Sequence, residues 1–415
     1  MPTLALTPLN RLIAAKALRG FGDGFVSLLL PIYLLNLGLS PFQVGLIATT
    51  TLLGSGVLTL LIGIHASRYD HRPLLLAASA LMAFTGLGMA SLESFWPLML
   101  VALVGTLNPS GGDVSVFMPV EHAMLASGVE GPRRTAVFAR YSLTGTLFAA
   151  FGSLAAALPG LFAPALGMAA QTAMQGMFVL YALLAVVMAA LYRGLPLRPA
   201  AEAAEPKSAL GPSKKRVYVL ATLFSLDAFG GGFIVQSLIA LWLYQRFGLS
   251  MEVAGTIFFW TGLLTAFSYL VAARIAKRIG LVKTMVYTHL PSSLCLIAIP
   301  FCTDLVYAVA LLLVRSALSQ MDVPTRSSYV MAIVTPQERA AAASVTSVPR
   351  SLAAAASPAL AGYLLGVSTF GWPLIIGGAL KIVYDILLLT MFSRVRPPEE
   401  IPSGELPAKA GKEWK

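Results

Sequence analysis

The sequence predicts an all-α membrane protein with twelve transmembrane helices, arranged as two parallel six-helix bundles, and three observations support this prediction. The 415-residue chain is 57% hydrophobic and only 11% charged, whereas soluble proteins carry about 25% charged residues. Apolar runs long enough to cross a hydrocarbon layer recur along the chain, separated by brief polar breaks. A sequence pattern in the first run returns in the seventh, which indicates a duplication. The short segments of alternating polarity typical of a transmembrane β-barrel do not occur.

The apolar runs give the position of each span. A helix is required in every one of them, because backbone N–H and C=O groups in lipid must be satisfied within the segment. The predicted spans cover residues 12–37, 42–65, 73–93, 96–119, 138–160, 168–192, 216–244, 252–277, 282–301, 304–331, 344–366 and 371–393.

Between the sixth and seventh runs lies a stretch rich in Pro, Ala and charged residues, which is typical of a linker. We therefore predict an N-terminal bundle over 1–193, a cytoplasmic linker over 194–215 and a C-terminal bundle over 216–393. Residues 394–415 are rich in Pro, Glu and Lys and are predicted to form a disordered cytoplasmic tail.

Loop charges predict the orientation. The net charge is +11, and the basic residues gather in every second connection and in the tail, so the positive-inside rule places both termini in the cytoplasm. The same distribution argues against nucleic acid as a partner, because no basic patch with interleaved aromatic residues lies outside the spans. The N-terminus has no cleavable signal pattern, and we expect the first helix to be retained.

An internal repeat relates the two halves. Residues 18–25 match residues 226–233, which aligns Arg19 with Asp227. The Asp-Val pair at 113–114 likewise matches the Asp-Val pair at 322–323. Two parallel copies of a six-helix unit predict a pseudo-twofold axis along the membrane normal and a cavity between the halves.

This organisation resembles the major facilitator superfamily over nearly the whole chain. The family has a signature in the loop after the second span, and residues 63–72 match its leading glycine, its arginine and its final basic residue, with Ser67 in place of the usual aspartate. The resemblance implies that this loop and its counterpart over 273–280 form cytoplasmic gates. The candidate gate residues are Gly63, Arg68, Asp70, Arg72, Arg278 and Gly280. The antiporter signatures of the fourth and fifth helices are absent from residues 105–113 and 145–152.

Ionisable side chains inside the spans are the candidates for the site, because a charge near the bilayer centre costs at least about 2.5–3.5 kcal/mol. The first set, expected to line a cavity for substrate and protons, is Arg19, Asp23, Asp113, Asp227, Asp322, Arg326 and Arg350. The secondary candidates are Asn108, Glu121, Gln236 and Arg315.

Several of these charges are spaced for pairing. Arg19 and Asp23 are four residues apart and either neutralise each other or act on substrate and protons. Since Arg19 aligns with Asp227, those two could instead face each other across the cavity. Lys381 and Asp385 have the same spacing, and we expect them to form a structural pair in a peripheral helix.

Other polar and aromatic residues have simpler predicted roles. A lone histidine in a span, His289, is expected to be structural. The segment 108–113 is a break within the fourth span whose free backbone groups are expected to face protein or water. The aromatic residues Trp96, Trp242 and Trp372 are predicted to anchor span ends at the membrane interface.

The resemblance implies a secondary active transporter that works by alternating access, is monomeric and lies in a bacterial inner membrane. We expect proton-coupled export of a small organic or amphiphilic compound, with proton-coupled uptake of a small anionic or zwitterionic metabolite as the alternative. A membrane-embedded enzyme is a remote alternative, because no catalytic motif is seen. Neither a metal site nor a phosphate-binding Gly-x-x-x-x-Gly-Lys loop is seen, so we predict no cofactor.

Overall fold

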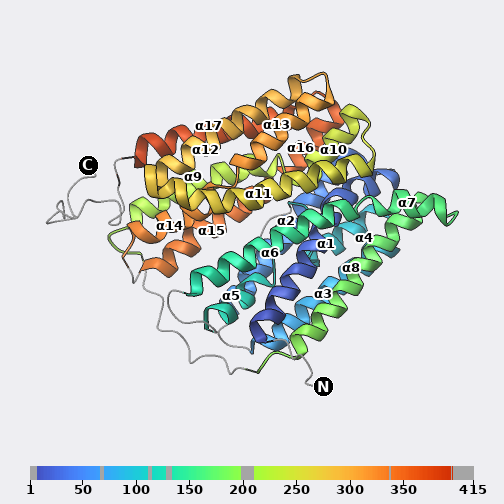
Figure 1. Cartoon of the computed structure of the whole chain (residues 1–415), viewed down its shortest axis with the longest axis horizontal. Coiled ribbons are helices and arrows are strands. Elements are labelled where there is room, and N and C mark those ends of the chain that lie inside the picture. The colour runs from blue at the N-terminus through green and yellow to red at the C-terminus, as the bar shows by residue number, and fades with distance from the viewer. Residues whose placement is uncertain are drawn as a thin grey trace.

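The computed structural model of the chain describes residues 7–65, 70–110, 115–127, 133–197, 210–335, 338–393 and 395. Regular structure in this part is helical, and the helices separate into two groups of similar size (Figure 1). The N-half comprises α1 (Pro8–Asn36), α2 (Pro41–His65), α3 (His71–Ser91), α4 (Phe95–Val104), α5 (Met118–Ser127), α6 (Arg133–Ala155), α7 (Leu158–Ala165) and α8 (Ala170–Arg193).

The C-half begins after the linker. It comprises α9 (Lys214–Gly232), α10 (Gln236–Phe247), α11 (Met251–Ile279), α12 (Leu281–Ala298) with the 3-10 turn η1 (Ile299–Phe301), α13 (Leu305–Leu318), α14 (Asp322–Ile333), α15 (Arg339–Ala356), α16 (Pro358–Val367) and α17 (Trp372–Phe392).

These helices reproduce the predicted spans. Ten segments of the described chain are long and apolar enough to cross a membrane. Two further spans are interrupted: α4 and α5 form the fourth, and α15 and α16 form the eleventh. The all-α fold with two six-span bundles is therefore confirmed.

Breaks recur at matching places in the two halves, and local sequence explains them. In the fourth span, helix α4 ends at Val104 before a segment that contains Pro109, whose ring removes a backbone donor. The tenth span breaks between α13 and α14. In the eleventh span, Pro358 takes the first position of α16, where its missing N–H costs nothing. In the seventh span, α9 ends in three consecutive glycines.

Small residues allow the halves to touch at the end away from the linker. A Cβ added to Gly45 of α2 would lie 2.5 Å from the Pro358 carbonyl of α16, and one added to Gly362 would lie 2.5 Å from the Pro41 carbonyl. A hydrogen bond of 3.0 Å from the Ala359 N–H to the Thr49 hydroxyl joins the same helices. Figure 1 shows the two groups converging toward α10 and α4 and separating toward α5 and α14.

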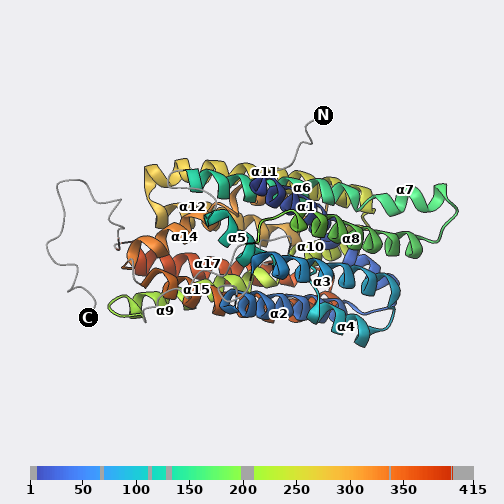
Figure 2. The ribbon, with the colours of Figure 1, turned by 90° about the horizontal axis from the view of Figure 1, so that it is seen from below.

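Glycines also allow close packing within the N-half. Gly20 and Gly24 of α1 face the backbone of α6 at Gly145 and Ala149, where a side chain would collide. Helix α6 is therefore the close neighbour of α1. Helices α6 and α11 then run side by side across the boundary between the halves (Figure 2).

Helix α9 begins at Lys214, close to the predicted end of the linker at residue 215. One predicted detail is corrected. Trp242 was expected at the membrane interface, yet it is buried and its indole N–H donates to the Thr369 carbonyl at 3.0 Å. Trp96 and Trp372 are exposed, as an interfacial position requires. The predicted tail lies outside the described residues, apart from Val395.

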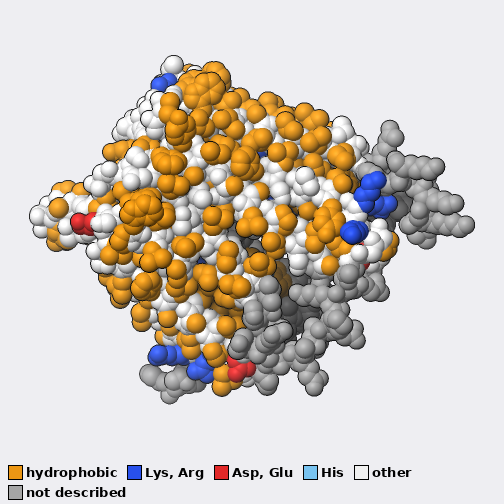
Figure 3. Space-filling model, turned by 180° about the vertical axis from the view of Figure 1, so that it is seen from behind, with side chains coloured by type: hydrophobic (Ala, Val, Ile, Leu, Met, Phe, Trp, Pro, Cys, Tyr) orange, Lys and Arg blue, Asp and Glu red, His pale blue; other side chains and the backbone are white. Residues whose placement is uncertain are grey.

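The outer surface suits lipid. Figure 3 shows apolar side chains over most of one face, with Lys and Arg side chains gathered near its edges. Large apolar side chains such as Leu100, Leu161 and Val306 are exposed. In water such a surface would be costly, but it is what a hydrocarbon environment requires.

Candidate functional site

A cavity with a volume of about 460 Å³ lies between the halves and is lined by both of them. The N-half wall consists of small, apolar and hydroxyl side chains and is uncharged among the described residues. Its residues are Gly24, Leu52, Ser110, Met118, Thr146, Ala149, Ala150 and Ser153. The charged side chains of the cavity wall come from the C-half and are Asp227, Arg315, Arg326, Arg350 and Lys381.

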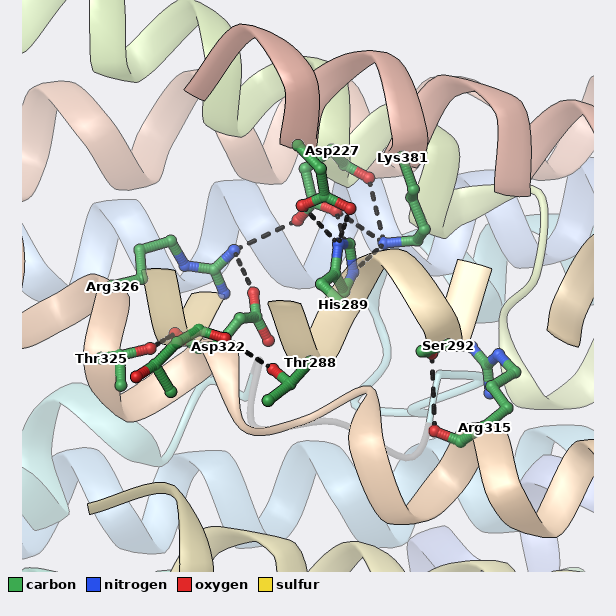
Figure 4. Close-up of polar contacts among 11 residues, drawn as sticks. Asp227, Thr288, His289, Ser292, Arg315, Asp322, Thr325, Arg326 and Lys381 are labelled. Carbon is green, nitrogen blue, oxygen red and sulfur yellow. Dashed lines mark hydrogen bonds and ion pairs between the residues drawn. The ribbon is translucent and has the colours of Figure 1, made fainter. Parts of the chain in front are cut away.

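Asp227 of α9 is the centre of the charged wall (Figure 4). Its Oδ1 accepts a hydrogen bond from Lys381 Nζ of α17 at 2.6 Å, and its Oδ2 accepts one from Arg326 Nη1 of α14 at 3.1 Å. Arg326 also pairs with Asp322, one helical turn earlier, at 3.2 Å. Two carboxylates and two cations from three helices are thus joined in one network, and all are largely buried.

A histidine and a second carboxylate extend this network. His289 of α12 places Nε2 at 3.7 Å from Asp227 Oδ1 and 3.5 Å from Lys381 Nζ. Its other ring nitrogen, Nδ1, lies 3.0 Å from Asp385 Oδ1. His289 therefore bridges Asp227, at the cavity, to Asp385, which is fully buried behind it. The contact with Asp385 is a hydrogen bond, whereas the 3.7 Å separation from Asp227 is longer than one.

The network corrects one prediction. Lys381 and Asp385 were expected to neutralise each other in a peripheral helix, but Lys381 binds Asp227 and Asp385 binds His289. His289 was expected to be structural; it is hydrogen-bonded to Asp385 and lines the cavity, and its role stays a prediction. The four-residue spacing of Lys381 and Asp385 correctly indicated that both side chains lie on one face of α17. It did not show that this face contacts α9 and α12.

Two further arginines line the cavity. Arg315 lies on α13 and Arg350 on α15. In the described part of the chain neither has a carboxylate within 4 Å, and Arg350 Nε is buried without a hydrogen-bond partner. Arg350 was among the first candidates for a substrate and proton cavity, and Arg315 was a secondary candidate. Both line this cavity, and their role in binding substrate or protons stays a prediction.

A separate cluster in the N-half contains Arg19. Its Nη2 lies 2.8 Å from Glu121 Oε2 of α5 and 2.8 Å from the Tyr141 hydroxyl of α6. Tyr141 donates to Glu121 Oε2, and Tyr192 of α8 donates to Glu121 Oε1 at 2.7 Å. The guanidinium also lies over the Phe117 ring, 4.8 Å from its centroid. Arg19 and Glu121 are almost completely buried, and neither lines the cavity.

This cluster overturns the predicted pairings of Arg19. The partner of Arg19 is Glu121, which is neither its helical neighbour Asp23 nor the repeat-related Asp227. The repeat nevertheless has a structural meaning, because each half holds one ion pair between its first and fourth spans. Arg19 pairs with Glu121 in the N-half, and Asp227 pairs with Arg326 in the C-half, with the signs exchanged.

The break in the fourth span forms part of the cavity wall. The Asn108 side chain accepts hydrogen bonds from the Ser110 N–H at 3.2 Å and from the Ser110 hydroxyl at 2.7 Å, which fixes the turn. The Pro109 carbonyl accepts the Ser237 N–H of α10 at 3.1 Å and so links the breaks of the fourth and seventh spans. Ser110 and Gln236 both line the cavity.

The remaining candidates fall elsewhere or outside the described residues. Asp23 is buried on α1 next to Gly24, which does line the cavity. Asp113 and Arg68 lie outside the described residues, and of Gly63 only its place in α2 is described. Asp70 precedes α3, and Arg72 lies in its first turn. Arg278 and Gly280 line a second cavity at the end of α11, together with Lys277 and Lys283.

No group of His, Cys, Asp or Glu that could hold a metal ion occurs in the part of the chain that the structure describes. The chemistry available at the site is therefore that of charged and titratable side chains around a cavity. Such a site can bind a polar solute and exchange protons with it.

Comparisons with known proteins indicate a membrane protein of one family. A model of the Major Facilitator Superfamily matches residues 12–319 and 220–414. An uncharacterised membrane protein of Saccharomyces cerevisiae, YJR124C, is 27% identical over 417 residues, which covers 91% of this chain and 92% of that protein.

Solved structures of transporters have the same fold. The nucleoside transporter NupG has a TM-score of 0.71 at 16% identity and covers 93% of this chain and 99% of that one. An inward-facing bacterial homologue of the human lysosomal transporter Spinster has a TM-score of 0.69 at 14% identity, over 92% and 95% of the two chains. The human organic anion transporter MFSD10 has a TM-score of 0.63 at 18% identity, over 92% and 100%.

Proposed function

This chain belongs to the major facilitator superfamily, and we propose that it couples the movement of a small organic solute to the movement of protons. Family membership makes it a secondary transporter that works by alternating access, and not an enzyme. The observation that carries the proton coupling is the buried network around Asp227 of α9, where α14 and α17 each place one cation on this cavity-lining carboxylate.

The network suits a titrating switch. Asp227 is stabilised as an anion by Lys381 and Arg326, so it takes up a proton only as these cations move away from it. Lys381 would then lose its carboxylate, whereas Arg326 keeps Asp322. An unpaired cation in a buried site is costly, and a helix arrangement that depends on the pair becomes less favourable. Protonation of Asp227 would thus loosen the contacts among α9, α14 and α17.

The conformation supports an assignment to one state of the cycle. Contacts such as Gly45 against Gly362 close the halves at the end away from the linker. We assign this conformation to the state open on the linker side. If the loop charges are oriented as the positive-inside rule predicts, that side is the cytoplasm. A location in a bacterial inner membrane remains a prediction.

The test is transport by purified protein in proteoliposomes. A panel of radiolabelled organic solutes is added while a dye trapped in the vesicles reports proton flux. We expect at least one solute to drive proton flux in the wild type, and we expect Asp227→Asn to abolish that flux while the protein still inserts. The control is Asp304→Asn, which changes a carboxylate on the exposed connection before α13. Equal proton flux in wild type and Asp227→Asn would contradict the proposed coupling.

The direction of transport is a separate question, because the same network serves export and uptake. An amphiphilic compound was one of the expected substrates. It fits this cavity less well than an ionic compound does, because four cationic side chains line the described wall.

A further inference from the structure

Among the residues that the structure describes, cations outnumber carboxylates on the cavity wall. Its described wall contains Arg315, Arg326, Arg350 and Lys381 but one carboxylate, Asp227. Asp322 and Asp385 lie just behind the wall and pair with Arg326 and His289. The network of Asp227, Asp322, Lys381 and Arg326 is balanced in charge. The excess therefore resides in Arg315 and Arg350.

These two arginines differ from the buried cations Arg19 and Arg326, each of which has a carboxylate within 3.2 Å. Arg315 and Arg350 are partly exposed on the cavity wall, and among the described residues no carboxylate lies within 4 Å of either. The Arg350 Nε is buried without an acceptor. Two partly desolvated guanidinium groups without an adjacent acid, in one cavity, can be completed by an anionic ligand.

We infer that the transported solute is an organic anion with two acidic groups, held by Arg315 and Arg350. This inference rests on the proposed transport function and specifies its substrate class. A guanidinium presents a planar fork of N–H donors that matches a carboxylate or phosphate. The uncharged N-half wall, with the hydroxyls of Ser110, Thr146 and Ser153, would contact the remainder of the solute without opposing its charge.

Hydroxyl groups lie on the same C-half wall as Arg315. Ser292 of α12 donates to the Arg315 backbone carbonyl at 3.5 Å (Figure 4), and Ser316 donates to the Leu312 carbonyl at 2.8 Å. Ser319 lines the wall as well. A hydroxyl has one proton to donate, so Ser292 and Ser316 could donate to an anion only by giving up their present acceptors.

The experiment measures binding without a gradient, so it does not depend on proton coupling. Thermal unfolding of the purified full-length protein in detergent is followed with succinate or phthalate, each compared with its singly charged monomethyl ester. We expect at least one of the dianions to raise the melting temperature more than its ester does. In Arg315→Gln and in Arg350→Gln, affinity for that dianion should fall by roughly tenfold or more.

A second readout needs no ligand. Because neither arginine has a carboxylate within 4 Å in the described part of the chain, Arg315→Gln and Arg350→Gln should not lower the melting temperature of the ligand-free protein. The matched control, Arg246→Gln, changes an exposed arginine of α10 and should have no effect on either measurement. The inference is overturned if esters bind as well as dianions, if no dianion of the panel binds, or if both variants lower the ligand-free melting temperature. If the wild-type protein binds a dianion but shows no solute-driven proton flux in proteoliposomes, only the proposed proton coupling is contradicted.

Discussion

The two halves each hold a buried charge cluster between their first and fourth spans, and the clusters differ in what surrounds the charges. In the N-half, two tyrosines and a phenylalanine enclose the pair of Arg19 and Glu121. In the C-half, Asp227 and Arg326 face the cavity and are joined by Lys381 and His289. Related positions in a duplicated fold have therefore separated into a sealed cluster and an open one.

The difference indicates which cluster stabilises the fold and which takes part in transport. A sealed ion pair cannot exchange protons or ligands without unfolding part of its half, so it stabilises one arrangement of helices. An open cluster can titrate and can bind solute, at some cost in stability. We expect changes in the N-half cluster to act on folding and changes in the C-half cluster to act on transport.

The largest expected effect is on the stability of the N-half. Glu121→Gln leaves Arg19 buried beside a neutral side chain, and removing one partner of a buried pair costs about 3–5 kcal/mol. We expect a strongly lowered melting temperature and poor recovery from the membrane. Replacing both partners, as Arg19→Leu with Glu121→Leu, should be milder. A double variant no more stable than Glu121→Gln would show that the pair is not an isolated unit.

The equivalent change in the open cluster should affect transport more than stability. Lys381→Met removes the closest cation from Asp227, and water in the cavity can solvate the carboxylate that remains. We expect a stability loss of about 1–3 kcal/mol together with loss of coupled transport in proteoliposomes. If Lys381→Met destabilised the protein as much as Glu121→Gln does and left transport intact, the distinction between the clusters would fail.

Asp385 gives a smaller effect, because it reaches the cavity only through His289. Asp385→Asn removes the carboxylate that orients the ring and supports its positive charge. Proton flux should fall by roughly tenfold at most, which is about 1.4 kcal/mol in the barrier, while solute counterflow at equal pH should change little. Equal loss of both activities would instead indicate a structural role for Asp385.

The smallest effect is expected outside both clusters, where Glu338 joins the α14–α15 connection to the start of α9. It accepts hydrogen bonds from the Gly211 N–H at 2.6 Å and from the Ser213 and Thr335 hydroxyls at 2.8 Å. Burial by itself would raise the pKa of Glu338, but these hydrogen bonds lower it to about 2. We expect Glu338→Gln to lower stability at pH 7 by about 1 kcal/mol.

The pH dependence checks that assignment. Because the folded-state pKa of Glu338 lies below its ordinary value, its contribution is complete above about pH 5 and is lost as the pH falls toward 2. The difference in melting temperature between wild type and Glu338→Gln should therefore be constant from about pH 8 to pH 5 and shrink below that range. A difference that grew on acidification would contradict this account.

Sequence alone was sufficient for the class and the family of this protein. Apolar runs of about 20 residues have one solution in lipid, the helix, because every backbone polar group must be paired within the segment. The duplication and the loop signature over 63–72 then pointed to the major facilitator superfamily, which the family match confirms. The break in the fourth span was predictable too, since its Asn, Pro and Gly residues interrupt an apolar run.

Only the tertiary structure decided which charges meet. Spacing along one helix suggested Arg19 with Asp23 and Lys381 with Asp385, but the structure pairs Arg19 with Glu121 and Lys381 with Asp227, across 102 and 154 residues. The physical reason is that a four-residue spacing shows which side chains share a helix face and leaves open what that face contacts. A buried charge then takes whichever partner the rotation and packing of neighbouring helices bring closest. Those rotations depend on contacts such as Gly20 against Gly145, which belong to the assembled fold.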